Sequence, residues 1–341
     1  MSYEVFQIPN SGSLIDGKLS IAVSNVHVQE SNIFSSATGS PNVSGSRHSR
    51  LITLLNQALE VDERVDLLIL PEVSVPHSYL PLMQRFCRMR QIGLIFGLEH
   101  RLISHERPAP SDIGTAYNHV VTLLPNRQFG LFRTCHTHRR LKRHYAPGET
   151  RELLDRRVAL PSVPRELYPL FHWRGVYFTV FNCYELANVE DRSKFRSKID
   201  FMVTVEWNPD TNYFSNLAES TARDLHCYFV QVNTSQYGDS RIVSPSKSDR
   251  MNLLRTKGGK NETLLVGELN IEALRQFQSL APSGQSGHDH FKMTPPDFSL
   301  DEIDNRVANR RPFDSPNLDS WQSPYVLPPH LCPPPHVPPG R

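Results

Sequence analysis

Short apolar runs that alternate with amphipathic helical patterns constrain the fold of this chain more than any other feature of its sequence. The run DLLILPE at 66–72 has a solidly apolar centre, which is typical of strands in parallel sheets. The run at 176–181 is rich in β-branched and aromatic residues and also predicts a buried strand. Further strands are expected at 19–28, 92–99, 200–207, 227–234, 240–243 and 264–269.

Helical patterns and one hairpin lie between these runs. Expected helices span 47–60, 77–90 and 211–226. The segments 117–124 and 128–134 predict a hairpin whose turn is Pro125-Asn126-Arg127. The stretch 31–50 is expected to be a loop, and 135–170 an irregular segment. Because helices alternate with strands in both halves, we expect two sheets sandwiched between helical layers, in one α/β domain of about 275 residues.

The chain divides into three expected parts: an N-terminal extension at 1–17, a folded domain at 18–280 and a Pro-rich tail at 281–341. Thirteen of the 27 prolines lie beyond Ala281. Because proline lacks a backbone N–H, the tail is not expected to form a regular helix or a central strand. It is either disordered or an extended arm that lies over the domain or a partner.

Composition argues against several classes of protein. The chain is 38% hydrophobic and 21% charged, which is sufficient for a folded core, and its net charge of +2 gives no global attraction to nucleic acid or membranes. No apolar run approaches the length that spans a membrane, and the N-terminus lacks the pattern of a signal peptide. Five cysteines without framework spacing indicate a reducing compartment, so a cytoplasmic location is expected.

Cys183 is the first candidate catalytic residue. It stands where the strand at 176–181 gives way to a helix that is expected to begin near Tyr184. On such a turn the sulfur is exposed, and backbone N–H groups of the helix start lower the thiol pKa and can hold an oxyanion. The simpler alternative is a small buried hydrophobic residue at a strand end.

A hydrolytic cysteine needs a base and a positive group, and two further stretches are placed to supply them. Glu72 is the last residue of the run at 66–72 and directly follows its buried strand, and the carboxyl ends of parallel strands gather active sites. Lys142 lies after a strand and before a Pro-Gly turn. Taken singly, a glutamate at a strand end such as Glu72 is more often a solvated or capping residue, and Lys142 is most simply part of a solvated basic face.

Taken together, three motifs resemble the nitrilase superfamily of carbon–nitrogen hydrolases. They are LPE at 70–72, KRHYAPGE at 142–149 and NCYE at 182–185. The similarity also includes YNHVV at 117–121, Val232-Asn233, GDSRIVSP at 238–245 and LLVGELNIEAL at 264–274. The resemblance covers roughly residues 18–275. It implies a four-layer α-β-β-α sandwich and a Glu-Lys-Cys triad.

Carried over position by position, the resemblance implies that Cys183 is the nucleophile and Glu72 the general base. Lys142 would stabilise the tetrahedral intermediate, with the backbone N–H of Tyr184 as a second donor, and Glu149 would orient the lysine or the leaving amine. The expected substrate-binding residues are Tyr184, Trp207 and Asn208. The implied activity is hydrolysis of a non-peptide carbon–nitrogen bond in an amide, carbamoyl compound or nitrile, through a thioester or thioimidate. No cofactor or metal is expected.

The sequence departs from the family pattern just after the cysteine. Glu185 stands where the family has aspartate, Ala187 where it has arginine, and Val189-Glu190 where it has Pro-Glu. On the late helix, Asp224-Leu225 replaces the family's Glu-Asn. These changes leave the triad intact but alter residues that shape or brace the pocket, so the substrate class stays open.

A Cys/His-rich and basic tract offers rival interpretations. Its possible metal ligands are Cys135, His136, His138 and His144, but their spacing fits no standard zinc pattern. Its basic residues are Arg133, Arg139, Arg140, Lys142 and Arg143. They are expected to form a solvated rim that could favour an anionic substrate, acidic partner or phosphate. Nucleic-acid binding is not expected, because interleaved aromatic residues are missing.

Two further hypotheses concern the class of activity. A hydrolase-like domain with an altered pocket could serve as a binding or regulatory subunit, although such a protein has no chemical reason to keep all three triad residues. An acyltransferase or amidotransferase would use the same triad and differ only in what attacks the thioester. The resemblance also implies a homodimer or larger homo-oligomer, in which the Pro-rich tail could contact a neighbouring subunit.

Overall fold

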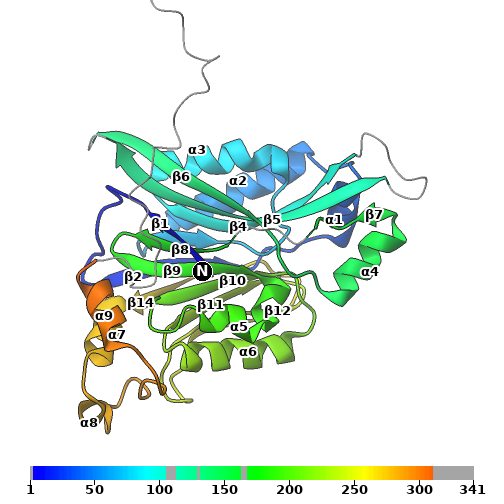
Figure 1. Cartoon of the computed structure of the whole chain (residues 1–341). Coiled ribbons are helices and arrows are strands. Elements are labelled where there is room, and N and C mark those ends of the chain that lie inside the picture. Colours follow the sequence, from blue (N-terminus) through cyan, green and yellow to red (C-terminus); the bar gives the residue numbers. More distant parts are fainter. Residues whose placement is uncertain (1–2, 105–112, 129–130, 163–166, 310–341) are drawn as a thin grey trace, which may run out of the picture.

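Two β-sheets lie face to face and helices cover their outer faces (Figure 1). The computed structural model describes residues 3–104, 113–128, 131–162 and 167–309. In Figure 1, α2 (Gly45–Glu60) and α3 (Leu80–Arg90) lie over one sheet, and α5 (Val189–Ser193) and α6 (Thr211–Asp224) over the other. The expected four-layer α-β-β-α sandwich is therefore confirmed.

Sheet A has seven strands. In spatial order they are β1 (Tyr3–Gln7), β8 (Tyr168–Trp173), β9 (Val176–Asn182), β10 (Phe201–Glu206), β11 (Tyr228–Asn233), β12 (Gly238–Val243) and β13 (Asn252–Lys257). β9, β10 and β11 run parallel, so their carboxyl ends reach the same edge of the sheet. That edge is where polar side chains from separate strands can meet.

Sheet B also has seven strands. They are β14 (Leu264–Asn270), β2 (Lys18–Ser24), β3 (Leu67–Ile69), β4 (Gly93–Ile103), β5 (Gly114–Gln128) and β6 (Phe132–Leu141), with β7 (Val158–Ala159) paired to β5. β2, β3 and β4 run parallel, whereas β5 and β6 form an antiparallel hairpin. Glu72 follows β3 and Lys142 follows β6, so both candidate residues come from sheet B.

Strand β10 shows why the central runs are apolar on both faces. Val203 and Val205 belong to the core between the two sheets, together with Ile69 and Ile95 from sheet B. Met202 belongs instead to the cluster beneath the helices that cover sheet A. Because successive side chains of a strand point to opposite faces, a strand with two buried faces requires an almost unbroken apolar run.

The remaining helices are shorter or lie at the ends of the sandwich. They are α1 (Glu30–Ala37), α4 (Pro147–Asp155), α7 (Ile271–Gln278), α8 (Pro282–Gln285), α9 (Leu300–Val307) and the 3₁₀ turns η1 (His77–Tyr79) and η2 (Cys183–Ala187). The helices expected at 47–60, 77–90 and 211–226 correspond to α2, to η1 with α3, and to α6. In the part of the chain that the structure describes, no helix has the length and apolar character needed to cross a membrane.

The stretch 31–50 was predicted to be a loop, and this prediction is wrong, because α1 lies within it and α2 begins at Gly45. The polar residues of α1 bond to their own helix: the hydroxyl of Ser36 donates to the carbonyl of Ile33, and that of Thr38 to the carbonyl of Phe34. Ile33 is almost completely buried, as is Ser36 three residues later. Serine and threonine lower helix propensity, but tertiary burial overrides that preference here.

The predicted hairpin is confirmed, but its turn is not Pro125-Asn126-Arg127, because β5 continues through these residues to Gln128. Pro125 pairs with Cys135 of β6 but lies beyond the stretch of β5 that pairs with β4. The carbonyl of Pro125 accepts a hydrogen bond of 3.0 Å from the indole N–H of the buried Trp173. Proline is tolerated where one side of a strand lacks a ladder partner.

The segment 135–170 is also more regular than predicted. It contains the end of β6, all of α4 and β7, and the start of β8. The β6 side chains His136 and His138 pack against the ring of Phe6 in β1, and His138 also packs against Phe171. These aromatic contacts join segments far apart in sequence, so periodicity along β6 alone could not reveal them.

Both ends of the described chain belong to the folded body. β1, in the predicted N-terminal extension, pairs in parallel with β8. Helices α8 and α9 lie in the predicted tail, where a regular helix was not expected, and this prediction is wrong for 282–285 and 300–307. The guanidinium of Arg306 on α9 donates to the buried carboxylate of Asp200 at 2.6 Å. The most Pro-rich part of the tail, 310–341, lies outside the described residues.

Candidate active site

Cys183 lies at a strained elbow between β9 and η2. Its φ angle is +49°, in the left-handed region that costs a residue with a side chain about 1–2 kcal/mol. Cys183 is only 5% exposed, so the prediction of an exposed sulfur is wrong. The sharp strand-to-helix turn expected from the sequence is present, although its first helical turn is 3₁₀.

Lys142 lies between two carboxylates. Its Nζ donates to Oε1 of Glu72 at 2.7 Å and to Oε2 of Glu149 at 2.5 Å. Lys142 and Glu72 are almost completely buried, with exposures of 1% and 2%. Lys142 thus contacts Glu72, which is 70 positions away in sequence, and Glu149, which is 7 positions away. A buried ammonium requires such negatively charged partners.

Asn118 on β5 connects this trio to the cysteine strand. Its amide Nδ2 donates to Glu72 at 2.9 Å and to Glu149 at 3.0 Å, and its Oδ1 accepts from the side chain of Asn182 at 3.1 Å. Sequence reasoning gave Asn118 no role. The available signal was its place in the YNHVV stretch of the family resemblance, which marked the strand and not the side chain.

Burial and charge set the protonation of these groups. Burial raises the pKa of Glu72, although Lys142 opposes the shift. Burial disfavours the charge on Lys142, but Glu149 and Glu72 raise its pKa well above the usual value. Burial likewise acts against the charge of Glu149, but Lys142 and His100 hold its pKa below the usual range. A carboxyl with a raised pKa is a stronger base than an exposed one.

The prediction that the Cys183 thiol has a lowered pKa is wrong. Burial raises its pKa well above the usual value, the nearby Glu72 adds to this shift, and Lys142 opposes it. The charges of Glu72 and Lys142 thus act in opposite directions on the pKa of the thiol. A neutral thiol needs a base to remove its proton as it attacks.

Glu185 joins the cysteine segment to the lysine segment. Its carboxylate accepts two hydrogen bonds from the guanidinium of Arg140, at 2.7 and 2.6 Å. It also accepts from the backbone N–H of Arg143 at 2.6 Å and from that of Asn182 at 2.7 Å. The prediction of a solvated basic rim is wrong for Arg140 and Lys142, because each is 1% exposed. Arg140 instead neutralises the wholly buried carboxylate of Glu185.

Glu206 is a second carboxyl near the thiol that sequence reasoning missed. It ends β10, and the preceding residue, Val205, pairs with Asn182 next to the cysteine. Its Oε2 accepts from Gln231 at 3.1 Å, and its Oε1 has no hydrogen-bond partner among the described residues. Burial raises the pKa of Glu206 well above the usual value. No sequence motif distinguished it from an ordinary polar strand end.

The predicted substrate-binding residues lie along the same edge of the sheets. Tyr184 follows Cys183 and is half-buried. The backbone N–H of Trp207 donates to Oε2 of Glu72 at 3.2 Å, which connects β10 to the carboxylate trio. Asn208 is buried, and its backbone N–H donates to the side chain of Asn233 at 3.0 Å. Trp207 thus contacts the site through its backbone, a contact that sequence reasoning could not specify.

The Cys/His tract does not converge on one point. His136 and His138 face Phe6, whereas the thiol of Cys135 lies 3.8 Å from the carbonyl of Gln84 on α3. His144 instead pairs with Asp191 at 3.2 Å. Within the described ranges, no group of three or more His, Cys, Asp or Glu side chains is arranged to hold a metal ion.

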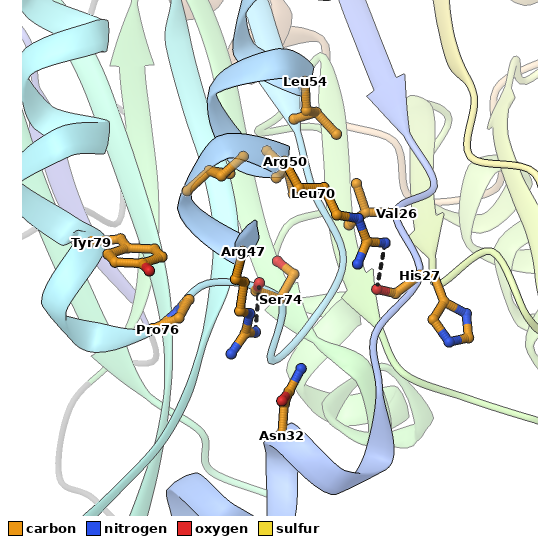
Figure 2. A pocket seen from close by; sticks show the side chains of 11 residues that line it. Val26, His27, Asn32, Arg47, Arg50, Leu54, Leu70, Ser74, Pro76 and Tyr79 are labelled. Atoms are coloured by element: carbon orange, nitrogen blue, oxygen red, sulfur yellow. Dashed lines mark hydrogen bonds between the residues drawn. The ribbon is translucent and has the colours of Figure 1, made fainter. Parts of the chain in front are cut away.

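A small cavity of about 40 Å³ lies beside the segment that carries Glu72 (Figure 2). It is bounded by α1, α2 and the loops that follow β2 and β3, and Ser74 lines it. Figure 2 shows the Arg47 side chain directed at the carbonyl of Ser74, with a separation of 3.5 Å. Arg47 also forms an ion pair with the buried Glu99. These contacts hold the chain two residues beyond Glu72, and neither Glu72 nor Cys183 lines the cavity.

Comparisons of the sequence and of the structure with known proteins gave different results. No protein-family model matches the sequence, and no curated protein matches it. Solved structures do match. Nit3 from Saccharomyces cerevisiae, a member of branch 10 of the nitrilase superfamily, aligns with a TM-score of 0.52 and 15% identity over 78% of this chain and 96% of that protein.

Two bacterial structures give similar results. A CN-hydrolase superfamily protein from Xanthomonas campestris, with an arsenic adduct in its active site, aligns with a TM-score of 0.52 and 14% identity, covering 80% of this chain and 98% of that one. An amidase from Nesterenkonia sp. aligns with a TM-score of 0.50 and 16% identity, covering 77% and 95%. A mutant of that amidase carries the acetamide moiety of fluoroacetamide on its active-site cysteine. The chain therefore has the nitrilase fold.

Proposed function

We propose that the protein is a divergent member of the nitrilase superfamily that hydrolyses a non-peptide carbon–nitrogen bond, with Cys183 as nucleophile. The observation that carries this proposal is the buried Lys142 ammonium, which is held between Glu72 and Glu149 and acts electrostatically on the Cys183 thiol. A buried ammonium with two carboxylates is costly to assemble for packing alone.

Glu72 is the general base of the first step. As the Cys183 sulfur attacks the carbonyl carbon, Glu72 takes the thiol proton and the carbon–oxygen π electrons move to oxygen. Lys142 stabilises the oxyanion that forms, and the backbone N–H of Tyr184 is the second donor. Glu72 then gives its proton to the leaving nitrogen, the carbon–nitrogen bond breaks, and a Cys183 thioester remains.

Water completes the cycle. Glu72, again a carboxylate, removes a proton from a water molecule as its oxygen attacks the thioester carbon. The carbon–sulfur bond breaks, the thiol is reprotonated, and a carboxylic acid leaves. With a nitrile, addition of the thiol across the triple bond would give a thioimidate, which water hydrolyses in the same site.

Asn118 and Glu149 keep these groups in place. Glu149 supplies the second negative charge that keeps Lys142 protonated despite its burial. Asn118 donates to both carboxylates, so it fixes the positions of Glu72 and Glu149 around Lys142. The covalent acetamide adduct in the Nesterenkonia amidase mutant supports an amide as the first substrate class to test.

A product assay tests the proposal. The protein is incubated with panels of small primary amides, carbamoyl compounds and nitriles, and released ammonia is measured for wild type and for Cys183→Ala. We expect turnover of at least one class by wild type and none by the variant. Full activity of Cys183→Ala on a hydrolysed substrate would overturn the mechanism.

Two alternatives use the same site differently. An acyl- or amidotransferase would pass the acyl group to an amine, so added hydroxylamine or a primary amine would divert the product from acid to amide. A non-catalytic regulatory subunit would show no turnover and no selective reaction of Cys183 with an electrophilic probe. The intact set of Glu72, Lys142 and Cys183 favours an enzyme.

The proposal also includes self-association and a Pro-rich tail that reaches a neighbouring subunit. Light scattering of the full chain measures the oligomeric state. A monomer at all accessible concentrations would remove this part of the proposal and leave the chemistry unaffected.

A further inference from the structure

Two free thiols meet where α3 packs on β6, on the outer side of sheet B. Cys87 lies on α3 and is wholly buried, and Cys135 lies on β6 and is partly exposed. Both belong to the same apolar cluster. The Cys135 sulfur lies 3.8 Å from the carbonyl of Gln84, three residues before Cys87 on α3, and each of the two thiols shifts the pKa of the other. Cys135, which belongs to the Cys/His tract, therefore has Cys87 as a neighbour, and the proposed hydrolysis uses neither thiol.

Cys135 is reachable from solvent through a positively charged groove. The groove has a volume of about 620 Å³, and Cys135 lines it together with Gln84, Arg85, Arg88 and Thr137. Arg88 lies one helical position after Cys87 and acts electrostatically on the Cys135 sulfur. A thiol that is partly exposed, close to an arginine and packed in the same cluster as a second thiol has the environment of a redox-reactive cysteine.

Charge and hydrogen bonding favour the Cys135 thiolate. The hydrogen bond from Cys87 lowers the pKa of Cys135 to about 7, partial burial opposes this shift, and Thr137 and Arg88 assist it. Burial raises the pKa of Cys87, which favours its protonated form. At neutral pH a large fraction of Cys135 is therefore nucleophilic, while Cys87 stays a thiol.

We propose that Cys135 is a hydroperoxide-reactive thiol and that Cys87 is its resolving partner, so that oxidation closes a disulfide between α3 and β6. The oxidant is a hydroperoxide, such as hydrogen peroxide, and the site is separate from Glu72, Lys142 and Cys183.

The chemistry balances in two steps. In the first, the Cys135 thiolate attacks one peroxide oxygen, a sulfur–oxygen bond forms, the oxygen–oxygen bond breaks and hydroxide leaves. Sulfur is oxidised by two electrons and the peroxide is reduced. In the second, the Cys87 sulfur attacks the sulfenic sulfur of Cys135, the sulfur–sulfur bond forms and the sulfur–oxygen bond breaks. The departing hydroxide takes the Cys87 proton and leaves as water.

Cys227 provides a matched control. It is a free thiol like Cys135, but it is wholly buried at the start of β11, and burial raises its pKa. It therefore has neither the thiolate fraction nor the access to react with peroxide. Every protein in the experiment carries Cys183→Ser, so that oxidation of Cys183 does not contribute to the signal. The result is then also independent of the proposed hydrolysis.

The experiment treats the reduced, full-length Cys183→Ser protein with a limiting amount of hydrogen peroxide near pH 7.5. Remaining thiols are alkylated, and peptides are analysed by mass spectrometry. We expect a Cys87–Cys135 disulfide as the main product. When Cys87→Ser is added, Cys135 should instead accumulate sulfenic acid that dimedone traps, whereas adding Cys135→Ser should abolish both products. Adding Cys227→Ser should change neither.

Three outcomes would overturn the proposal. The first is oxidation of Cys135 no faster than that of Cys227. The second is a disulfide from Cys135 to Cys332 or to another molecule in place of Cys87. The third is an unchanged yield of dimedone adduct on Cys135 whether or not Cys87 is present, since that would show that Cys87 does not resolve the sulfenic acid.

Discussion

The carboxylate of Glu185 binds the guanidinium of Arg140 through two hydrogen bonds of 2.7 and 2.6 Å, and this buried pair joins the two sheets beside the candidate active site. Arg140 precedes Lys142 by two residues, and Glu185 follows Cys183 by two. The same carboxylate also accepts from the backbone of Arg143 and Asn182. One residue that departs from the family pattern thus fixes the lysine segment relative to the cysteine segment.

Removing Arg140 is expected to destabilise the protein and to slow turnover. Arg140→Met leaves Glu185 buried without its charge partner, which costs about 3–5 kcal/mol. Urea unfolding measures the loss. The matched control is Arg139→Met, because Arg139 is the adjacent residue and its side chain is exposed. Equal stability of the two variants would show that the Arg140–Glu185 pair does not hold the sheets together.

Glu206→Gln is expected to make the protein more stable at alkaline pH. Burial raises the folded-state pKa of Glu206, so the folded protein binds a proton that the unfolded chain releases above about pH 4.3. Stability that depends on this proton is therefore lost as the pH rises from that value towards the folded-state pKa. Glutamine keeps the shape without the titration. Urea unfolding at pH 5 and pH 8 should show a larger advantage of the variant at pH 8, and an equal difference at both would contradict a buried neutral carboxyl.

Asp200 should make an opposite, acid-side contribution. Burial disfavours its charge, but Arg275 and Arg306 hold its pKa below the usual value. Its stabilisation is present above the unfolded pKa of about 3.9 and is lost as the pH falls through the lower folded value. Arg306→Ala should raise the Asp200 pKa, so acid unfolding monitored by circular dichroism should begin at a higher pH. The exposed Arg250→Ala is the control, and coincident curves for both variants would refute a role for the α9 contact.

Glu72→Gln is expected to lower kcat by about 10²–10⁴-fold, which is the usual contribution of a general base. Glutamine can still accept from Lys142 and Asn118, so the fold should be retained. The exposed Glu60→Gln controls for loss of a carboxylate as such. Steady-state kinetics on an identified substrate measure the effect. A kcat within twofold of wild type would assign the base to another residue.

The layers of the fold could be predicted because its central strands are buried on both faces. Strand β10 could be predicted from its apolar run alone. The run is unbroken because Val203 and Val205 face one core and Met202 faces the other. The turn after β5 could not be predicted, because Pro125 is accommodated by the lack of a β4 partner and by the distant Trp173. Helix α1 was missed for a similar reason, since burial of Ile33 outweighs weak local propensity.

The candidate site was predicted in part. Motif order indicated Glu72, Lys142, Glu149 and Cys183, and the first three are in direct contact. Asn118 and Glu206 were missed because an isolated polar residue in a strand has no local signature. Arg140 was misplaced on a solvated rim because its partner, Glu185, is 45 residues away and on the other sheet. Long-range pairing of buried charges is a property that one sequence does not reveal.

The most direct test of the account is detection of an acyl group on Cys183. The protein is mixed with an excess of small primary amides, or of activated esters of the corresponding carboxylic acids. The mixture is quenched in acid at short times and analysed by intact-mass and peptide mass spectrometry. The account predicts a mass increase of one acyl group, located on Cys183, that disappears as product forms and is absent in Cys183→Ala. Turnover without any acyl group on Cys183, or an acyl group that forms equally in Cys183→Ala, would contradict it.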